Sequence, residues 1–120
     1  MIPCDFTKHV LYRYAERFYY QSEENLQERL EKESRTVNKH MKDAFFAAKE
    51  DRSFLNDQNL MGYLWEKYGY DKHFRILIKD KVAFVVIREK GRDKVITCFP
   101  TSSAFFDRQK YRRSPKKNFK

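Results

Sequence analysis

The chain has 120 residues, of which 41% are hydrophobic and 17% are aromatic, with only three glycines and three prolines. This composition excludes a long disordered chain and indicates one domain of regular elements joined by short connections. Basic residues outnumber acidic ones by 26 to 17, which gives a net charge of +9.

The charge is unevenly distributed along the chain. Residues 1–70 contain 11 basic and 12 acidic side chains, whereas residues 71–120 contain 15 basic and 5 acidic ones. A field polarised in this way suits a polyanion, most simply nucleic acid, or an acidic protein partner. A basic surface without a specific ligand is the alternative.

Cysteine usage and hydropathy indicate where in the cell the protein resides. Cys4 and Cys98 fit neither a metal-ligand spacing nor a disulfide framework, so we expect free thiols, no metal and no cofactor. The N-terminus lacks the charged and apolar regions of a signal peptide, and no apolar run reaches transmembrane length. We therefore expect a cytoplasmic protein with no membrane partner.

The first predicted helix carries a conspicuous polar row. Thr7 is a suitable N-cap for a helix over about residues 8–20. His9, Arg13 and Arg17 follow one another at intervals of four residues, so they form a row beside the apolar stripe of this helix. The row is either a solvated polar face or a ligand-facing set, in which histidine exchanges a proton near neutral pH and arginine holds phosphate.

A second, longer helix is predicted to begin after Ser22 and to end at about Glu50. Its apolar stripe is narrow, and the remaining positions are a dense mixture of charges. This pattern indicates an exposed helix stabilised by pairs of opposite charge four residues apart. A kink is allowed near residues 34–36, and His40, which has polar neighbours, is expected to be exposed.

A third helix is predicted to end at Tyr68, with Asn56 or Asp57 as its N-cap and Gly69 as its C-terminal stop. Apolar residues recur on one side of this helix, so that side should face the core. The predicted core face is Leu60, Met61, Leu64, Trp65 and Tyr68.

From His73 the apolar residues alternate with a period of two, which predicts strands. Three strands are expected over about residues 74–79, 82–87 and 94–99, and the two short turns between them predict an antiparallel meander. The middle strand is apolar on both faces, as a strand covered on both sides would be. Pro100 should end the third strand because it lacks a backbone donor.

These elements predict an α+β domain over residues 1–113, with about three N-terminal helices packed on one face of a C-terminal antiparallel β-meander of three to four strands. Residues 101–113 form either a short helix or a fourth strand. Residues 114–120 should be a flexible basic tail.

Two separated segments resemble a family of small enzymes. Residues 6–17 contain Phe6 and Thr7, then His9 followed four residues later by Arg13, similar to the opening helix of several phage and toxin branches of that family. Residues 94–102 contain Val95–Ile96–Thr97 and then Phe99–Pro100, similar to a strand of that family with the pattern V-[IV]-T-x-[YF]-P. The order of these segments resembles the metal-independent ribonuclease superfamily that groups barnase, EndoU, the tRNA-cleaving colicins and RelE-type toxins.

The resemblance implies a toxin- or phage-effector-like endoribonuclease that cleaves RNA through its own 2′-hydroxyl, without a metal or cofactor. That reaction needs a base for the hydroxyl proton, an acid for the leaving 5′-oxygen and cations for the phosphorane charge. On this reading His9 is the base or acid, arginines stabilise the phosphate, and Tyr111 orients substrate or donates a proton. A hydroxyl of Thr97, Ser102 or Ser103 binds a phosphate oxygen. The implied catalytic residues are His9, Arg13, Arg17, Thr97 and Tyr111.

The same resemblance implies a substrate-binding segment after Pro100, and RNA, either tRNA or mRNA, as the partner. Two further hypotheses come from the residues alone. In the first, the protein is not an enzyme but a basic nucleic-acid-binding protein. In the second, it is an inhibitor of the phage type whose basic face docks an acidic protein partner. The implied substrate-binding residues are Ser102, Ser103, Arg108 and Lys110.

Overall fold

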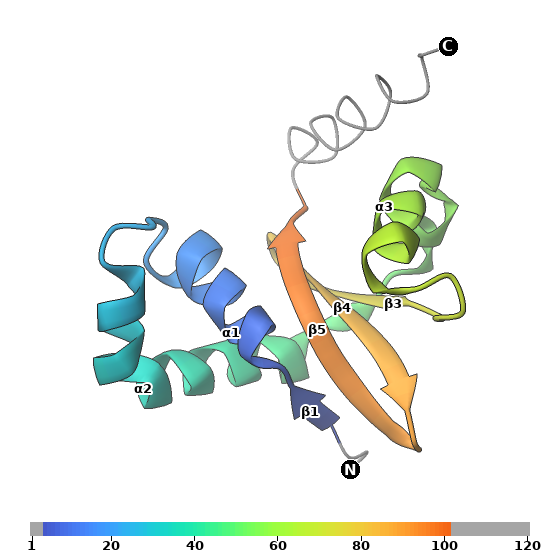
Figure 1. The fold of residues 1–120 in the computed structure, drawn as a ribbon. Coiled ribbons are helices and arrows are strands. Elements are labelled where there is room, and N and C mark those ends of the chain that lie inside the picture. Colours follow the sequence, from blue (N-terminus) through green and yellow to red (C-terminus); the bar gives the residue numbers. More distant parts are fainter. Residues whose placement is uncertain (1–3, 102–120) are drawn as a thin grey trace.

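The computed structural model describes residues 4–101, apart from the side chain of Leu55. Helices and strands both occur in this range, so the chain is α+β, as predicted (Figure 1). A π-helix at Ala15–Tyr19 continues α1, and a 3₁₀-helix at Arg52–Asn56 precedes α3. The other elements are β1 Cys4–Phe6, α1 Lys8–Tyr14, α2 Leu26–Ala47, β2 Lys49–Glu50, α3 Gln58–Tyr68, β3 Arg75–Lys79, β4 Val82–Glu89 and β5 Arg92–Pro100.

The described strands form one sheet in the order β1-β5-β4-β3-β2. Strands β3, β4 and β5 are the predicted antiparallel meander, and Pro100 is its last paired residue. The tight turns have left-handed residues, Asp80 (φ 54°), Lys90 (φ 53°) and Gly91 (φ 78°), and the glycine adopts such angles without steric cost. The prediction of three to four antiparallel strands was wrong, because β1 adds a parallel strand beside β5 and β2 adds a further edge strand.

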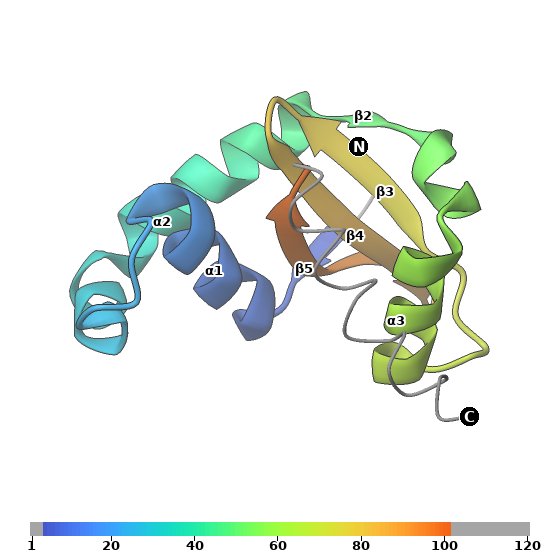
Figure 2. The ribbon, with the colours of Figure 1, turned by 90° about the horizontal axis from the view of Figure 1, so that it is seen from above.

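The sheet is covered on both faces, so the prediction of helices on one face was wrong (Figure 2). Helices α1 and α2 pack on one face, against alternate residues of β4 such as Phe84. Helix α3 packs on the other face, against the intervening residues such as Val85. Phe84 is fully buried, and its replacement by alanine should cost about 3–5 kcal/mol. The two-sided burial explains why β4 is apolar throughout.

The helix signals in the sequence were largely correct. Thr7 caps α1, Asp57 caps α3 through two backbone N–H groups, and Gly69 (φ 125°) follows the last residue of α3. Helix α2 has non-helical backbone angles at Glu33 (φ −118°, ψ 17°), one residue before the predicted kink. Among the described residues, no helix combines the length and apolar character needed to span a bilayer.

A β-bulge decides which way Thr97 points. Thr97 pairs with Val85, but Val86 pairs with Val95, so Ile96 is an extra residue in β5. Such an extra residue interrupts the alternation of side chains between the two faces. Thr97 therefore shares the face of its partner Val85, which is the face covered by α3.

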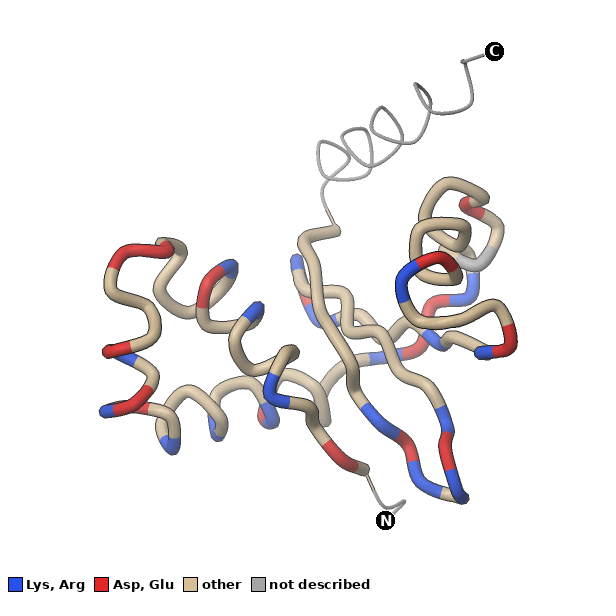
Figure 3. Tube along the Cα trace, in the orientation of Figure 1, with Lys and Arg blue, Asp and Glu red and all other residues tan. Residues whose placement is uncertain are grey.

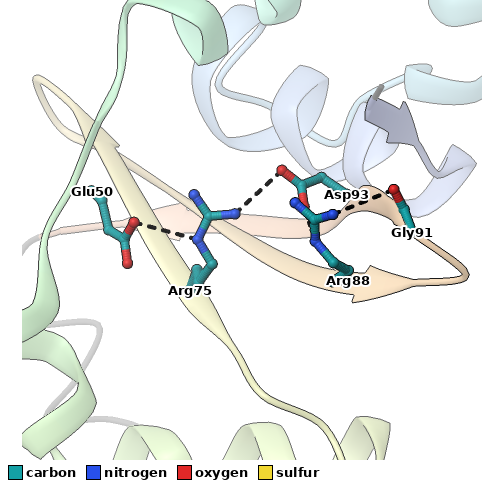
Figure 4. A network of polar contacts seen from close by, with 5 residues as sticks. All are labelled: Glu50, Arg75, Arg88, Gly91 and Asp93. Carbon is teal, nitrogen blue, oxygen red and sulfur yellow. Dashed lines mark hydrogen bonds and ion pairs between the residues drawn. The ribbon is translucent and has the colours of Figure 1, made fainter. Parts of the chain in front are cut away.

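Polar contacts join four strands on the face of α1 and α2 (Figure 4). Arg75 lies between two carboxylates, with Nε 3.3 Å from Glu50 Oε1 and Nη1 3.2 Å from Asp93 Oδ2. Arg88 Nε lies 3.2 Å from Asp93 Oδ1, an ion pair without hydrogen-bond geometry. We call Glu50, Arg75, Arg88 and Asp93 the sheet network. Asp93 is 7% exposed, so its charge depends on these arginines for compensation.

Candidate active site

The beginning of α1 is attached to β5. The Thr7 hydroxyl accepts a hydrogen bond from Val10 N (3.1 Å) and donates one to Ile96 O (3.3 Å). Thr7 N also donates to Val95 O at 3.2 Å. A single threonine thus caps the helix and fixes it to the bulged part of β5, which determines where the polar row of α1 lies.

The far end of the row is attached to the same strand. Arg17 Nη1 donates to Cys98 O at 2.8 Å. Burial lowers the pKa of Arg17, and the positive charge of Arg13 lowers it further, although a guanidinium stays protonated at neutral pH. Arg13 forms an ion pair with Glu16, with Nη1 2.8 Å from Oε1. The row therefore presents two guanidiniums with one neighbouring carboxylate.

His9 has the surroundings of a base. Its Nε2 is buried, and no described residue hydrogen-bonds to it. Burial lowers the pKa of His9, the positive charges of Arg13, Lys67 and Arg17 lower it further, and Glu16 opposes them. Each of these cations disfavours the imidazolium, so the imidazole is mainly neutral at pH 7 and can accept a proton.

Helix α3 supplies the residues opposite this row. Lys67 Nζ donates to the Tyr63 hydroxyl at 3.3 Å and lies 5.6 Å and 5.8 Å from the ring centres of Tyr63 and Tyr68. The charge of Lys67 acts on His9, and the charges of Arg13 and Arg17 act on Tyr68. This flank of α3 is therefore electrostatically coupled to the polar row of α1.

Thr97 joins the same neighbourhood from the sheet. It is 6% exposed, and its side chain lowers the pKa of Tyr68. Burial raises the pKa of Tyr68, while the side chain of Thr97 and the two arginines act in the opposite direction, so Tyr68 is a neutral phenol at pH 7. In Figure 1 the end of β5 lies between α1 and α3. We call this set the α1–α3 site: His9, Arg13, Arg17, Tyr63, Lys67, Tyr68 and Thr97.

Of the residues predicted from the sequence, His9, Arg13 and Arg17 lie on α1, which packs on one face of the sheet, whereas Thr97 faces α3 on the other face. The charges of Arg13 and Arg17 act on Tyr68, the residue of α3 whose pKa Thr97 also lowers. The other five predicted residues, Ser102, Ser103, Arg108, Lys110 and Tyr111, lie outside the described residues.

Sequence reasoning missed Tyr63, Lys67 and Tyr68. The spacing of Tyr63 and Lys67 by four residues places them on one side of a helix, but it gives no indication of which element that side faces.

His40 is exposed, as predicted, and lies outside the α1–α3 site. Its Nδ1 is 2.8 Å from the hydroxyl of Tyr14, whose pKa burial raises to about 12. Both residues line a separate cavity of about 400 Å³ beside the β3–β4 turn. Across residues 4–101, no group of three or more His, Cys, Asp or Glu side chains is arranged to hold a metal ion.

The charge excess is divided between the described sheet and the segment after it. Along the β4–β5 hairpin, basic and acidic residues are interspersed (Figure 3). Residues 71–101 contain 8 basic and 4 acidic side chains, whereas residues 102–120 contain 7 basic and 1 acidic. More than half of the positive excess of the second half therefore lies in the segment that follows β5.

Comparison with known proteins gives this chain no relative. No protein-family model, no curated protein and no solved structure matches it. The chemistry of the α1–α3 site is therefore the basis for a functional proposal.

Proposed function

We propose that this protein is a metal-independent endoribonuclease that cleaves RNA by attack of a 2′-hydroxyl on the adjacent phosphate. One observation carries the proposal: a partly buried, mainly neutral histidine lies among three cations, Arg13, Arg17 and Lys67, beside two tyrosines. A general base, phosphate-binding cations and proton-bearing hydroxyls are the groups that this reaction needs.

His9 acts as the general base. Its lowered pKa keeps the imidazole neutral at physiological pH, and its buried Nε2 has no hydrogen-bond partner among the described residues. A rotation of the imidazole that exposes Nε2 to substrate would let this nitrogen accept the 2′-hydroxyl proton as the O2′–P bond forms. The cations that lower the pKa of His9 can also bind the phosphate, so the same groups bind the substrate and keep the base neutral.

Arg13, Arg17 and Lys67 stabilise the phosphorane. The in-line reaction places a second negative charge on the phosphate oxygens, and fixed cations in a partly buried site stabilise that charge more than water does. Arg13 is held by Glu16 and Arg17 by Cys98 O, so both guanidiniums are positioned before substrate binds. Such positioning reduces the reorganisation that the transition state requires.

A tyrosine donates the proton to the leaving 5′-oxygen as its bond to phosphorus breaks. Tyr68 remains protonated at neutral pH because burial raises its pKa. Tyr63 is the neighbouring phenol, held by Lys67. Tyr111, the tyrosine proposed from the sequence, lies outside the described residues. We further propose a cytoplasmic location, where tRNA and mRNA are available, and an acidic protein as a possible neutralising partner.

Incubation of the purified protein with total RNA in EDTA tests this proposal. We expect the wild type to cleave RNA, His9→Ala to lose at least about a hundredfold in rate, and His40→Ala to match the wild type. Salt-sensitive RNA binding without cleavage would replace the proposal with a non-catalytic nucleic-acid-binding function. Neither cleavage nor binding would point to the docking of an acidic protein.

A further inference from the structure

A groove of about 600 Å³ borders the α1–α3 site on the side of α2. It lies between α1 and the first half of α2, and His9 is one of its lining residues. Its volume falls in the range of small-molecule sites, and it is large enough for one nucleotide base. A ligand in this groove would therefore lie directly beside the candidate general base.

Tyr12 connects the groove to the α1–α3 site. It lines the groove, and at 37% exposure its ring is accessible to a ligand. The Arg13 guanidinium lies 5.9 Å from the centre of this ring. Tyr12 can therefore stack on a base in the groove while Arg13, the next residue, contacts the phosphate of the same nucleotide.

The groove combines an apolar surface with a polar edge. Leu11 and Leu30 are partly buried in the core beneath it. Gln27, Glu31 and Ser34 are exposed residues of α2 that also line it, and their spacing places them on one side of the helix. An apolar surface beside hydrogen-bonding side chains is what recognition of an unstacked base in RNA requires.

We propose that this groove binds the base of a nucleotide adjacent to the scissile phosphate and prefers a base with an exocyclic amino group, that is adenine, cytosine or guanine over uracil. This inference rests on the proposed ribonuclease function. The Glu31 carboxylate only accepts hydrogen bonds, so it can accept from an exocyclic amino group. Uracil has no exocyclic amino group. Its N3–H can donate one hydrogen bond to the carboxylate, but a flanking carbonyl oxygen then lies against the second carboxylate oxygen, which makes this pairing weaker.

A second groove indicates the path of the neighbouring nucleotide. It has a volume of about 380 Å³ and shares Leu11 and Ser34 with the first. Arg35 and Asn38 complete its lining. The Arg35 guanidinium can hold a phosphate with paired donors, so the chain of the substrate would continue along α2. The exposed charges of this long helix then serve RNA binding as well as helix stability.

Mapping of cleavage positions in RNA of mixed sequence tests the proposal. For the wild type we expect one position next to the cut to exclude uridine by about tenfold or more. Glu31→Gln should reduce this discrimination to about threefold or less, because an amide also donates a hydrogen bond to uracil oxygens. The matched control is Glu28→Gln, an exposed glutamate of α2 outside the groove lining, which should keep the wild-type preference.

A second variant tests the stacking role. Tyr12→Ala should raise KM by about tenfold and change kcat little, because stacking contributes mainly to binding. Tyr12 and Glu31 are both exposed, so thermal unfolding midpoints close to that of the wild type should show that these variants fold.

Two results would overturn the inference in different ways. Cleavage without preference against uridine, unchanged in Glu31→Gln, would remove the groove from base recognition and leave the ribonuclease function in place. No cleavage of any RNA by the wild type would overturn the proposed function and this inference together.

Discussion

The sheet network and the α1–α3 site both contain arginines, but the two regions differ in how positive charge is compensated. In the sheet network, Arg75 and Arg88 share the carboxylate of Asp93, and Arg75 also pairs with Glu50. In the α1–α3 site, three cations lower the pKa of one histidine, and the nearby carboxylate of Glu16 opposes them only in part.

The difference shows that the number of cations does not identify a binding site. The sheet network uses its arginines to compensate a buried carboxylate and join strands, so little field remains for a ligand. In the α1–α3 site, the charges of Arg13, Lys67 and Arg17 act together on a neutral histidine, an arrangement that suits a phosphate. The predictions below test this contrast.

The largest effect is expected from removing an arginine of the site. Arg13→Ala should lower the rate of RNA cleavage by about a hundredfold, because it removes a fixed cation from the phosphorane. Arg88→Ala is the matched control and should remain within about threefold of the wild type. Equal losses in the two variants, measured by gel-based cleavage of one RNA, would contradict the contrast.

The reverse experiment removes a carboxylate from the sheet network. Asp93→Asn should lower the free energy of unfolding by about 1–2 kcal/mol, since the hydrogen bond from Arg75 loses its charged acceptor, the ion pair with Arg88 is lost and the arginines are partly exposed. Asp43→Asn, at an exposed pair with Lys39, should cost less than about 0.5 kcal/mol. Urea unfolding measures both values, and cleavage by folded Asp93→Asn should be unchanged.

A smaller effect is expected from changing the field on His9. The rate of cleavage should fall as the pH is lowered through the pKa of His9, because protonation removes the base. This acid limb of the pH–rate profile should lie below the ordinary histidine pKa of about 6.5. Lys67→Gln removes one of the charges that lower this pKa and should move the limb to higher pH. Lys79→Gln, on the β3–β4 hairpin, should leave the limb where it is. A limb unmoved by Lys67→Gln would show that the cation does not act on the base.

The smallest effect concerns stability. The pKa of His9 is lower in the folded state than in the unfolded state, so the unfolded chain binds the proton more tightly. The corresponding stability is complete above about pH 6.5 and is lost as the pH falls through the folded-state pKa. His9→Gln should make the free energy of unfolding fall less steeply below pH 6.5. A slope identical to that of the wild type would mean that His9 does not titrate differently on folding.

The elements with local signals could be predicted from the sequence. Thr7 and Asp57 are capping residues, and Gly69 stops α3, because each acts on the backbone within a few residues of itself. The meander followed from alternating apolar residues and short turns. Strand β1 could not be predicted, since three residues carry no period and their pairing partner lies about 90 residues away in sequence.

The composition of the α1–α3 site depended on two further features of the fold. A strict alternation would place Thr97 on the same face as Val95, but the extra residue Ile96 turns it toward α3. The position of α3 on the second face then puts Tyr63 and Lys67 within electrostatic range of the polar row of α1. Neither the bulge nor the face that a helix covers is determined by residues close in sequence.

The most direct test of the central claim compares one oligonucleotide in two forms, with EDTA present in both reactions. One form is RNA, and the other carries 2′-O-methyl groups at every position. Because the mechanism uses the 2′-hydroxyl as nucleophile, we predict cleavage of the RNA to products ending in a 2′,3′-cyclic phosphate and no cleavage of the methylated form. Cleavage of both forms, or of neither, would contradict the account.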